Sequence, residues 1–491
     1  MINPILIIAI ALGTAFSLGL FKKLGKELSL AVTLIALSAM AFISAQWLSG
    51  FLHGGLADRV IETAGGKAPF VIVLHMGLPE ALFTFMINVM AVLGAFYMHD
   101  RFTEHGHGAM AVYIAAVMGM NGIVLTSDIF NLFVFLEIAT IGTVGLVLLV
   151  SDFKALTAGF KYMMASGVVS GLFLLGIIFL YNHTGTLNLQ GLMAAHPAAI
   201  KGGGIAVFLV MMALLLELKP FPANGWGIDL YEGAPAGVAA LVSAASATAT
   251  CFVLLKLLPL GGIFWYKTAA AVGITTFVAS NLMALTQTHA RRILGYSSMG
   301  QLGLLVGIAG LQPMLGSAGM FVVLTILGTH YLAKAGLFWV AGIINDDRIS
   351  AWAALRKSPI LIIMFGVFLF ALLGFPPFPS FFGKWQLIMG LVSAKLYWWA
   401  GAILFGTLIE SVYLFRWFGH ALKGDLEGLE KPRLDLYKVS PPLAFMVILF
   451  PLGYVTSTYI EGLTFIHFIP LIMALAIALL EFLPAWTKNI L

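Results

Sequence analysis

The stretch LLLELKPFPANGW, residues 214–226, places two opposite charges inside an apolar run and follows them at once with prolines. The charges are Glu217 and Lys219, and the prolines are Pro220 and Pro222. Proline lacks the backbone N–H that an α-helix needs, and it pushes the residue before it out of helical geometry. The stretch therefore predicts a helix that breaks beside two buried charges.

The composition around this stretch is that of a membrane protein. Of 491 residues, 61% are hydrophobic and 10% are charged, and the mean hydropathy of +1.02 is far above what a soluble core requires. Apolar runs long enough to cross about 30 Å of hydrocarbon recur along the chain. We therefore predict an all-α polytopic membrane protein with fourteen or fifteen transmembrane helices. The runs begin near residues 4, 27, 72, 109, 129, 155, 202, 235, 265, 292, 315, 358, 396, 440 and 464.

Basic residues on the short links predict the orientation. The first apolar run is followed by Lys22, Lys23 and Lys26 and has no basic residue before it, which favours a retained first helix over a cleaved signal peptide. With residue 1 outside, about fifteen Lys and Arg fall on inside links and about five on outside links. We predict a multi-pass protein of the cell membrane with its N-terminus outside. The net charge of +5 reflects this bias, and nucleic acid is not expected as a partner.

Few residues of this chain suit a cofactor or a metal. Cys251 is the one cysteine, so the sequence has no disulfide and no thiolate set for zinc or an iron–sulfur cluster. His99, His105 and His107 share the polar link HDRFTEHGHG, where histidines are more often solvated than metal-bound, and we leave them out of the candidate sites. We expect no cofactor and no metal, so any redox chemistry belongs to another chain.

A second proline-broken run lies five predicted helices downstream. ELKPFPANGW near residue 220 and GFPPFPSFFGKW near residue 380 each combine a break with a lysine, and about 160 residues separate them. A duplicated unit with an odd number of helices must insert upside down relative to its copy. The spacing therefore favours two inverted five-helix repeats, each with one broken helix. The hydrophilic segment 423–442 predicts an inside loop and no separate domain.

Nine charged side chains remain inside the predicted spans. A charge at the middle of a bilayer costs about 2.5–3.5 kcal/mol even on the lenient insertion scale, so these side chains must face protein, water or one another. Helix breaks help, because they free backbone carbonyls for water or cations and supply a hinge at membrane depth. The nine residues are Lys161, Lys219, Lys256, Lys334, Lys384, Arg416, Glu137, Glu217 and Glu410.

Structural explanations compete with functional ones at some of these positions. Lys161 and Lys384 lie near helix ends or breaks, where a lysine can extend to the interface. Arg416 and Glu410 lie at helical spacing near an inside end and can form a simple tertiary pair. A buried lysine and a glutamate that approach and separate can exchange a proton near neutral pH, which is what a relay needs. The positions that favour such a role are Glu137, Lys219, Lys256 and Lys334.

Several segments resemble one family: the antiporter-like membrane subunits shared by proton-pumping NADH:quinone oxidoreductase, the Mrp-type sodium/proton antiporters and the energy-converting membrane hydrogenases. DIFNLFVFLE, residues 128–137, resembles the fifth-helix signature that ends in the family's essential glutamate, here Glu137. DLYEGAPAGVAALVSAAS, residues 229–246, resembles the segment leading into the eighth helix, whose lysine would be Lys256. RRILGYSSMGQLGLL, residues 291–305, resembles the start of the tenth helix.

Two later segments extend the resemblance. HYLAKAGLFWVAG is similar to the eleventh helix of the family, with His330 and Lys334 at the matching positions. GFPPFPSFFGKW is similar to the broken twelfth helix, with Lys384 as its ionisable residue. The resemblance runs from about residue 75 to residue 420.

The resemblance implies a fold and an activity. Residues 1–108 would form three helices. Helices four to eight would form a first inverted repeat at residues 109–260, and helices nine to thirteen would form a second at residues 261–422. Residues 423–491 would hold an inside loop and the C-terminal helices. Each repeat would hold a half-channel, and a polar axis along the membrane midplane would join them. The implied relay for H⁺, or for H⁺ in exchange for Na⁺, consists of Glu137, Lys219, Lys256, Lys334 and Lys384, with Glu217, His330, Glu410, Arg416 and Lys161 as auxiliary residues.

One position departs from the family pattern. The family's seventh-helix lysine lies four residues before a Phe-Pro pair, which corresponds to Glu217 here, whereas Lys219 comes two residues late. On an ideal helix, two residues span about 200° and would aim these side chains apart. Because the break lets Lys219 turn into the axis, we predict that Lys219 holds the relay position with Glu217 as its local partner. Asn224 replaces a histidine of the family and cannot titrate.

These features support one leading hypothesis and two alternatives. The leading hypothesis is a non-redox, ion-translocating subunit of a larger complex, with homologous antiporter-like subunits beside it in the lipid bilayer and hydrophilic redox subunits on other chains. One alternative is a stand-alone secondary antiporter that uses the same charges. The other is a structural spacer in which the altered seventh helix has lost transport. The sequence leaves open the choice between H⁺ and Na⁺ and the branch of the family.

Overall fold

The computed structural model of the chain is almost entirely helical, with one two-stranded sheet among the residues it describes. The chain divides into two compact units, Met1–Gly273 and Ile274–Leu491. The helical fold class is confirmed, and the sheet is an exception to it. The described residues are 1–20, 25–63, 71–150, 152–199, 202–316 and 318–460, so the run predicted near residue 464 lies outside them.

Ten helices of the described residues are long and apolar enough to cross a membrane, judged by length and composition. Three further apolar helices are shorter: α1 (Ile5–Leu20), α9 (Gly203–Glu217) and α16 (Pro359–Leu373). Both α9 and α16 are short because each ends at a break that contains prolines. One of the ten, Ala236–Ala284, contains the 3₁₀ turn η4 (Leu258–Gly261). The chain is therefore a multi-pass membrane protein.

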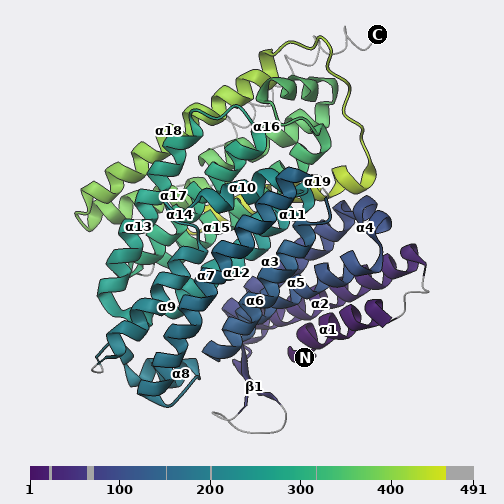
Figure 1. The fold of residues 1–491 in the computed structure, drawn as a ribbon. Helices are drawn as coiled ribbons and strands as arrows, with labels where there is room; N and C mark the ends of the chain where they lie inside the picture. Colours follow the sequence, from purple (N-terminus) through teal and green to yellow (C-terminus); the bar gives the residue numbers. More distant parts are fainter. Residues whose placement is uncertain (21–24, 64–70, 151, 200–201, 317, 461–491) are drawn as a thin grey trace. The chain divides into compact units, whose positions relative to one another are not determined.

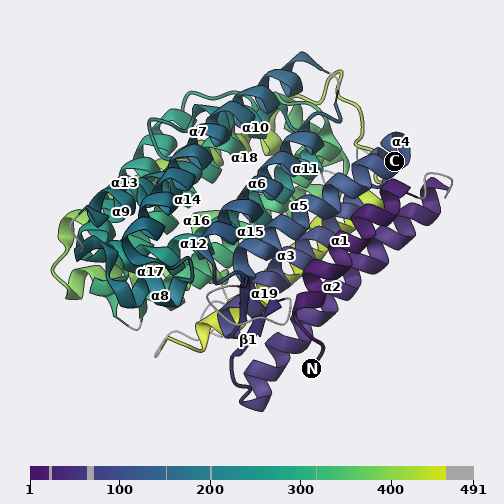
Figure 2. The same cartoon turned by 60° about the horizontal axis from the view of Figure 1, so that its bottom comes forward.

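The first unit is a bundle of helices. Its further helices are α2 (Lys26–Gly54), α3 (Leu78–Tyr97), α4 (His99–His105), α5 (His107–Leu125), α6 (Ile129–Val147), α7 (Phe153–Thr184), α8 (Leu189–Ala195), η2 (Pro197–Ala199), α10 (Gly225–Gly233), α11 (Ala236–Leu241), the π-helical η3 (Val242–Ser246) and α12 (Ala247–Leu257). Figures 1 and 2 show α2 beside α3 and α5 beside α6, and α7 packs against both α6 and α9. A Cβ atom at Gly119 of α5 would lie only 2.6 Å from the backbone nitrogen of Ala139 in α6, so glycine is what permits this close approach.

A short β-hairpin precedes α3, where the sequence predicted only an apolar run leading into a helix. Its strands are β1 (Arg59–Glu62) and β2 (Val73–Met76), which pair in antiparallel fashion with Val60 opposite His75. The backbone of Ser127 donates a hydrogen bond to the carbonyl of Val73 at 2.8 Å. The hairpin is thereby attached to the link between α5 and α6, and four-residue strands are too short to show a clear alternating pattern in the sequence.

The second unit is organised around one central helix. Its elements are the part of α13 (Gly262–Ala284) from Ile274 onward, α14 (Ala290–Leu315), α15 (Ala318–Ile344), η5 (Ile349–Lys357), α16, α17 (Pro379–Ser393), α18 (Tyr397–Lys423) and α19 (Leu436–Ser457). The central helix α15 packs against α14, α16, α17 and α19, so most of its side chains are buried. The charged residue Lys334 on α15 is fully buried and therefore faces protein.

Both predicted helix breaks are confirmed. Helix α9 ends at Glu217, Lys219 adopts φ +56°, and α10 starts at Gly225. Helix α16 ends at Leu373, Gly374 adopts φ +81°, and α17 starts at Pro379. Positive φ is incompatible with continuing an α-helix, and it is rare for a residue with a side chain such as Lys219.

Candidate functional site

The first break buries Glu217 and Lys219 together. Glu217 is 8% exposed and Lys219 is 6% exposed. Lys219 Nζ donates a hydrogen bond to the Glu217 carbonyl at 3.0 Å and lies 4.0 Å from Glu217 Oε1. The left-handed backbone at Lys219 turns its side chain back toward α9, which an unbroken helix would prevent. The two residues therefore occupy one site.

Aromatic rings complete the surroundings of Lys219. Its Nζ lies 4.7 Å from the ring centre of Trp226 in α10 and 5.8 Å from that of Tyr162 in α7. A ring face attracts a cation within about 6 Å of its centre. Carbonyl, carboxylate and ring faces thus stabilise a positive charge at this depth, where lipid would exclude it.

A small cavity adjoins Glu217 between α6, α7 and α9. Its volume is ≈ 20 Å³, and about 10–15 Å³ is enough to hold one water molecule. The lining includes the hydroxyl-bearing residues Thr140, Ser166 and Ser170 together with Glu217. Glu137, half-buried one turn before Thr140 on α6, interacts electrostatically with Glu217. The sequence-predicted Glu137 therefore belongs to the same neighbourhood as the first break.

Lys256 lies in the last turn of α12, away from that break. Its Nζ donates to the carbonyl of Thr126 at 3.0 Å and lies 3.4 Å from Glu80 Oε1 in the first turn of α3. The Phe252 ring centre is 5.5 Å from the same nitrogen. Lys256 thus has an acidic partner that the sequence did not indicate.

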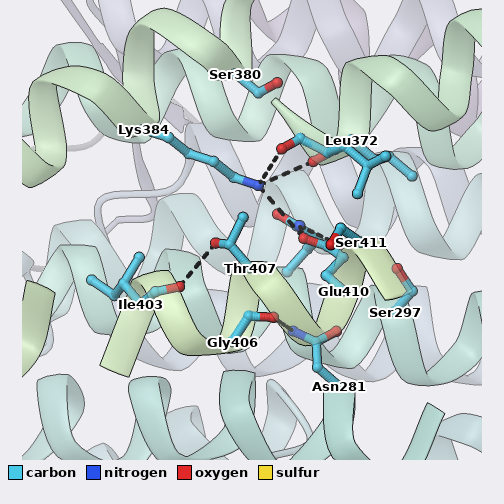
Figure 3. Close-up of polar contacts among 12 residues, drawn as sticks. Asn281, Ser297, Leu372, Ser380, Lys384, Ile403, Gly406, Thr407, Glu410 and Ser411 are labelled. Carbon is cyan, nitrogen blue, oxygen red and sulfur yellow. Dashed lines mark hydrogen bonds and ion pairs between the residues drawn. The ribbon is translucent and has the colours of Figure 1, made fainter. Parts of the chain in front are cut away.

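The second break holds Lys384 in a comparable way, as Figure 3 shows. Lys384 Nζ donates to the carbonyls of Leu372 and Leu373, at 3.1 and 3.3 Å, where α16 ends. It also lies 3.5 Å from Glu410 Oε2 on α18. The side chain of Lys384 is 11% exposed, so these contacts hold it inside the fold.

Glu410 is fully buried and held from two sides. The amide nitrogen of Gln301 on α14 donates to both carboxylate oxygens, at 2.7 and 2.8 Å, while Lys384 approaches from α17. The expected tertiary pair of Arg416 with Glu410 is therefore wrong. Arg416 instead donates to the carbonyls of Leu285 and Gln287, because its position on α18 faces the residues that follow α13.

Lys334 is fully buried in the middle of α15. Its Nζ donates to the hydroxyl oxygen of Ser297 on α14. His330 lies one turn earlier on the same helix and is 1% exposed. Both residues therefore face the α14–α15 contact, in the interior of the second unit.

Lys161 has a surface role in the structure. Its side chain is 51% exposed, and its Nζ lies 2.6 Å from Asp229 Oδ2 of α10. The two residues border a hollow of ≈ 220 Å³ that Lys154 and Glu232 also line. Lys161 is thus exposed, whereas the lysines of the two breaks are buried.

The two breaks share one chemical arrangement. In each, an ammonium group binds a carbonyl that the break has freed and lies within 4.0 Å of a buried carboxylate. Such a lysine and glutamate can carry a single shared proton in either of two positions. No set of three or more His, Cys, Asp or Glu side chains in the described ranges is placed to hold a metal ion.

Sequence reasoning missed the partners on neighbouring helices. Glu80 lies in the first turn after Gly77, where an acid is common as a helix cap, so its position alone does not indicate a partner such as Lys256. Ser297 and Gln301 lie four residues apart on α14, so they share a helix face, and that spacing was the available signal. Neither side chain is charged, so neither is conspicuous in an apolar run.

Comparisons with known proteins add an independent line of observation. Residues 126–410 match the family described as NADH:quinone oxidoreductase/Mrp antiporter, transmembrane. The chain is 28% identical over 461 residues to the NADH-quinone oxidoreductase subunit N of Desulforudis audaxviator (strain MP104C), with 89% of each chain covered. It is 28% identical over 388 residues to a Na(+)/H(+) antiporter subunit of Alkalihalophilus pseudofirmus, which covers 76% of this chain and 78% of that relative.

A solved structure is similar along almost the whole chain. It is that of the membrane-bound sulfane sulfur reductase, an archaeal respiratory membrane complex. The similarity has a TM-score of 0.85 at 27% sequence identity and covers 93% of this chain and 95% of that chain.

Proposed function

The chain belongs to the NADH:quinone oxidoreductase/Mrp antiporter family of transmembrane subunits, and on that premise we propose that it moves H⁺, or exchanges H⁺ for Na⁺, within a multisubunit complex. The family resemblance predicted from the motifs is confirmed. Relatives of this chain are named as subunits of an NADH-quinone oxidoreductase and of a Na⁺/H⁺ antiporter. The energy for translocation comes from other chains of the complex.

One observation carries this proposal: each helix break buries a lysine beside a carboxylate and freed carbonyls. Lys219 has Glu217, and Lys384 has Glu410. A charge costs about 2.5–3.5 kcal/mol at mid-bilayer, so a purely structural subunit would gain more from apolar residues at these places. Paired lysines at helix breaks are instead suited to hold, release and receive a proton.

We assign the relay roles unit by unit. In the first unit, Glu137 and the Glu217–Lys219 pair receive the ion and Lys256 passes it on. In the second unit, Lys334 and the Lys384–Glu410 pair act in the same manner, with Lys334 in the interior on α15. His330 supports Lys334 as an auxiliary residue, whereas Arg416 and Lys161 bind backbone and surface partners and serve the structure.

The proposed step is a change of partner by the lysine. While Lys219 stays beside Glu217, its positive charge is stabilised by the carboxylate and by the Glu217 carbonyl. If the break moves and separates them, the ammonium loses that stabilisation and gives up its proton to a water or a neighbouring base. The freed carboxylate then accepts the next proton from the side of Glu137, through the hydroxyl-lined cavity.

The wider architecture is part of the proposal. The chain has fourteen or fifteen transmembrane helices, with inverted repeats at 109–260 and 261–422 after an N-terminal segment 1–108. Two proline breaks of similar design, five helices apart, support this arrangement. The positive-inside count supports an N-terminus on the outside of the cell membrane. Homologous membrane subunits and hydrophilic redox subunits are its partners.

Transport by the assembled complex tests the proposal. The complex is reconstituted in liposomes with Glu137→Gln, and ion movement is followed with a pH-sensitive dye and with radioactive sodium. We expect the rate to fall by at least about tenfold, because a positioned acid–base group contributes that much or more to proton transfer. The control is Glu104→Gln, an exposed glutamate on α4 that pairs with Arg101.

The outcomes separate the candidate functions. Undiminished transport in Glu137→Gln would remove that residue from the mechanism. A wild-type complex that assembles normally but gains no transport from this chain would favour a spacer. Exchange by the chain purified alone would favour a stand-alone antiporter.

A further inference from the structure

Glu80 is a buried carboxylate outside the relay proposed above. Its Oε1 atom lies 3.4 Å from Lys256 Nζ and 3.1 Å from His75 Nδ1. Its other oxygen, Oε2, accepts the backbone N–H of Gly77 at 3.2 Å. One oxygen therefore bridges a half-buried lysine and a histidine, while the other fixes the carboxylate in place.

The fold brings these groups together at one end of the first unit. Helix α3 begins here, α5 and α12 end here, and the β1–β2 hairpin lies against the link that follows α5. Lys256 reaches across to the carbonyl of Thr126, and Leu74 forms a backbone bridge with the same residue. The hairpin thus places His75 directly over the end of α3.

The chain of polar groups continues from His75 to the surface. His75 Nε2 lies 3.4 Å from Asp58 Oδ2. The side chains are 6% exposed at Glu80, 21% at His75 and 62% at Asp58. Exposure therefore rises in steps from the buried carboxylate to a solvated one.

The surroundings of His75 favour its protonated form. The hydrogen bond with Glu80 raises the pKa of His75 above its ordinary value, burial opposes this, and the charge of Asp58 adds to the rise. Lys256 acts in the opposite direction. These three groups, from α3, α12 and the link before β1, are the described charges that act on the ring. Its charge thus responds to whether Lys256 and Glu80 are charged.

We propose that Glu80 and His75 form the proton port between Lys256 and the solvent on the hairpin side of the membrane. The proposal rests on the ion-translocating function proposed above and assigns residues to its outer end. With the N-terminus outside, this side is the exterior of the cell. The occupant of the port is a proton, because every link is a titratable group within hydrogen-bonding distance of the next.

Each transfer balances as a simple proton exchange. Lysine ammonium and Glu80 carboxylate become a neutral amine and a carboxylic acid when the proton passes to Oε1. A neutral His75 ring that carries its proton on Nε2 then takes the Glu80 proton on Nδ1, which returns Glu80 to a carboxylate. The imidazolium formed, which these surroundings favour, releases its Nε2 proton to Asp58 or to water. The reverse order carries a proton inward.

A helix cap alone does not account for this arrangement. Capping uses only Oε2 of Glu80, through Gly77. A static ion pair of Glu80 with Lys256 would not require a histidine on the other side of the same oxygen. The distinction is measurable, because a structural contact affects assembly whereas a port affects rate and its dependence on pH.

The test compares His75→Gln, Glu80→Gln and a matched histidine variant in the reconstituted complex. The control is His53→Gln, an exposed histidine at the end of α2 whose Nδ1 lies 3.2 Å from the Ser49 carbonyl of the same helix. We expect both port variants to lower the initial proton flux by at least about tenfold and His75→Gln to flatten the pH profile. The control should change neither, and assembly is checked by size-exclusion chromatography.

Chemical rescue separates a proton carrier from a structural contact. In His75→Ala, added imidazole should restore much of the flux, because a diffusible base can occupy the space beside Glu80. A small molecule cannot repair a misfolded hairpin, so rescue supports the port. Absence of rescue together with an unchanged pH profile in His75→Gln would overturn it.

The two proposals fail in different ways. If Glu137→Gln stops transport while His75→Gln keeps the wild-type flux and pH profile, the port is wrong and the ion-translocating function stands. If both variants and the wild type show no transport, the function itself is wrong.

Discussion

Loss of the Glu410 carboxylate should destabilise the second unit more than loss of any exposed charge. Glu410 is fully buried, and Lys384 Nζ lies 3.5 Å from its Oε2. At an effective dielectric of about 20, unit charges at this distance attract by about 5 kcal/mol. Removing one partner of a buried pair costs about 3–5 kcal/mol. Because Lys384 keeps the carbonyls of Leu372 and Leu373, we expect Glu410→Gln to cost about 3 kcal/mol.

Thermal unfolding followed by tryptophan fluorescence measures this cost. For a unit of this size each kcal/mol lowers Tm by about 2–4 °C, so Glu410→Gln should lose about 6–12 °C. Adding Lys384→Met should recover most of that loss, because the double variant no longer buries an unpaired charge. The control pair Lys161→Met and Asp229→Asn should change little, within about 1 kcal/mol, although its 2.6 Å distance is shorter.

The double variant decides the argument. If Lys384→Met and Glu410→Gln lower Tm additively, the two side chains do not interact and the second break does not hold a coupled pair. If the exposed control pair costs as much as the buried one, burial is not what gives the pair its strength.

Two further predictions concern the other buried lysines. Glu217→Gln and Lys219→Met should each slow transport by the assembled complex by at least about tenfold, since the pair is one site; a normal rate in either variant would assign the relay to the other residue alone. Ser297→Ala should lower the free energy of unfolding by about 1–3 kcal/mol, because the buried Lys334 ammonium loses its hydroxyl acceptor. Thermal unfolding measures this loss. The control, Ser411→Ala, should show no such loss, since Ser411 is half-buried and its hydroxyl donates to a carbonyl of its own helix.

The sequence was informative about where charge is buried and where helices break. Prolines act on the backbone of their own segment, so the breaks near Lys219 and Lys384 could be predicted locally. A buried charge is conspicuous in an apolar run for the same reason. The partners were harder to predict, because Gln301 on α14 and Glu410 on α18 meet only in the folded second unit. The spacing of Ser297 and Gln301 indicates a shared helix face, but it does not indicate which helix that face contacts.

Glu80 shows a second limit of sequence reasoning. An acid in the first turn of a helix is common, so its presence after Gly77 suggests a cap and nothing more. Its contact with His75 depends on a hairpin whose strands are each four residues long. Because β2 is embedded in an apolar run that continues into α3, its alternation is not visible in the sequence. The sequence therefore does not indicate that His75 lies beside the start of α3.

The structure shows how Lys219, which comes two residues after the position of the family's lysine, relates to Glu217. Counting along an ideal helix, Glu217 and Lys219 differ by about 200° and would compete for one position. The left-handed backbone at Lys219 cancels that rotation and brings its Nζ to the carbonyl of Glu217. In the second unit, Lys384 obtains its carboxylate from another helix, α18. In the first unit, the acid stands two residues away in the same break, so the substitution that seemed to remove the lysine instead supplied its partner.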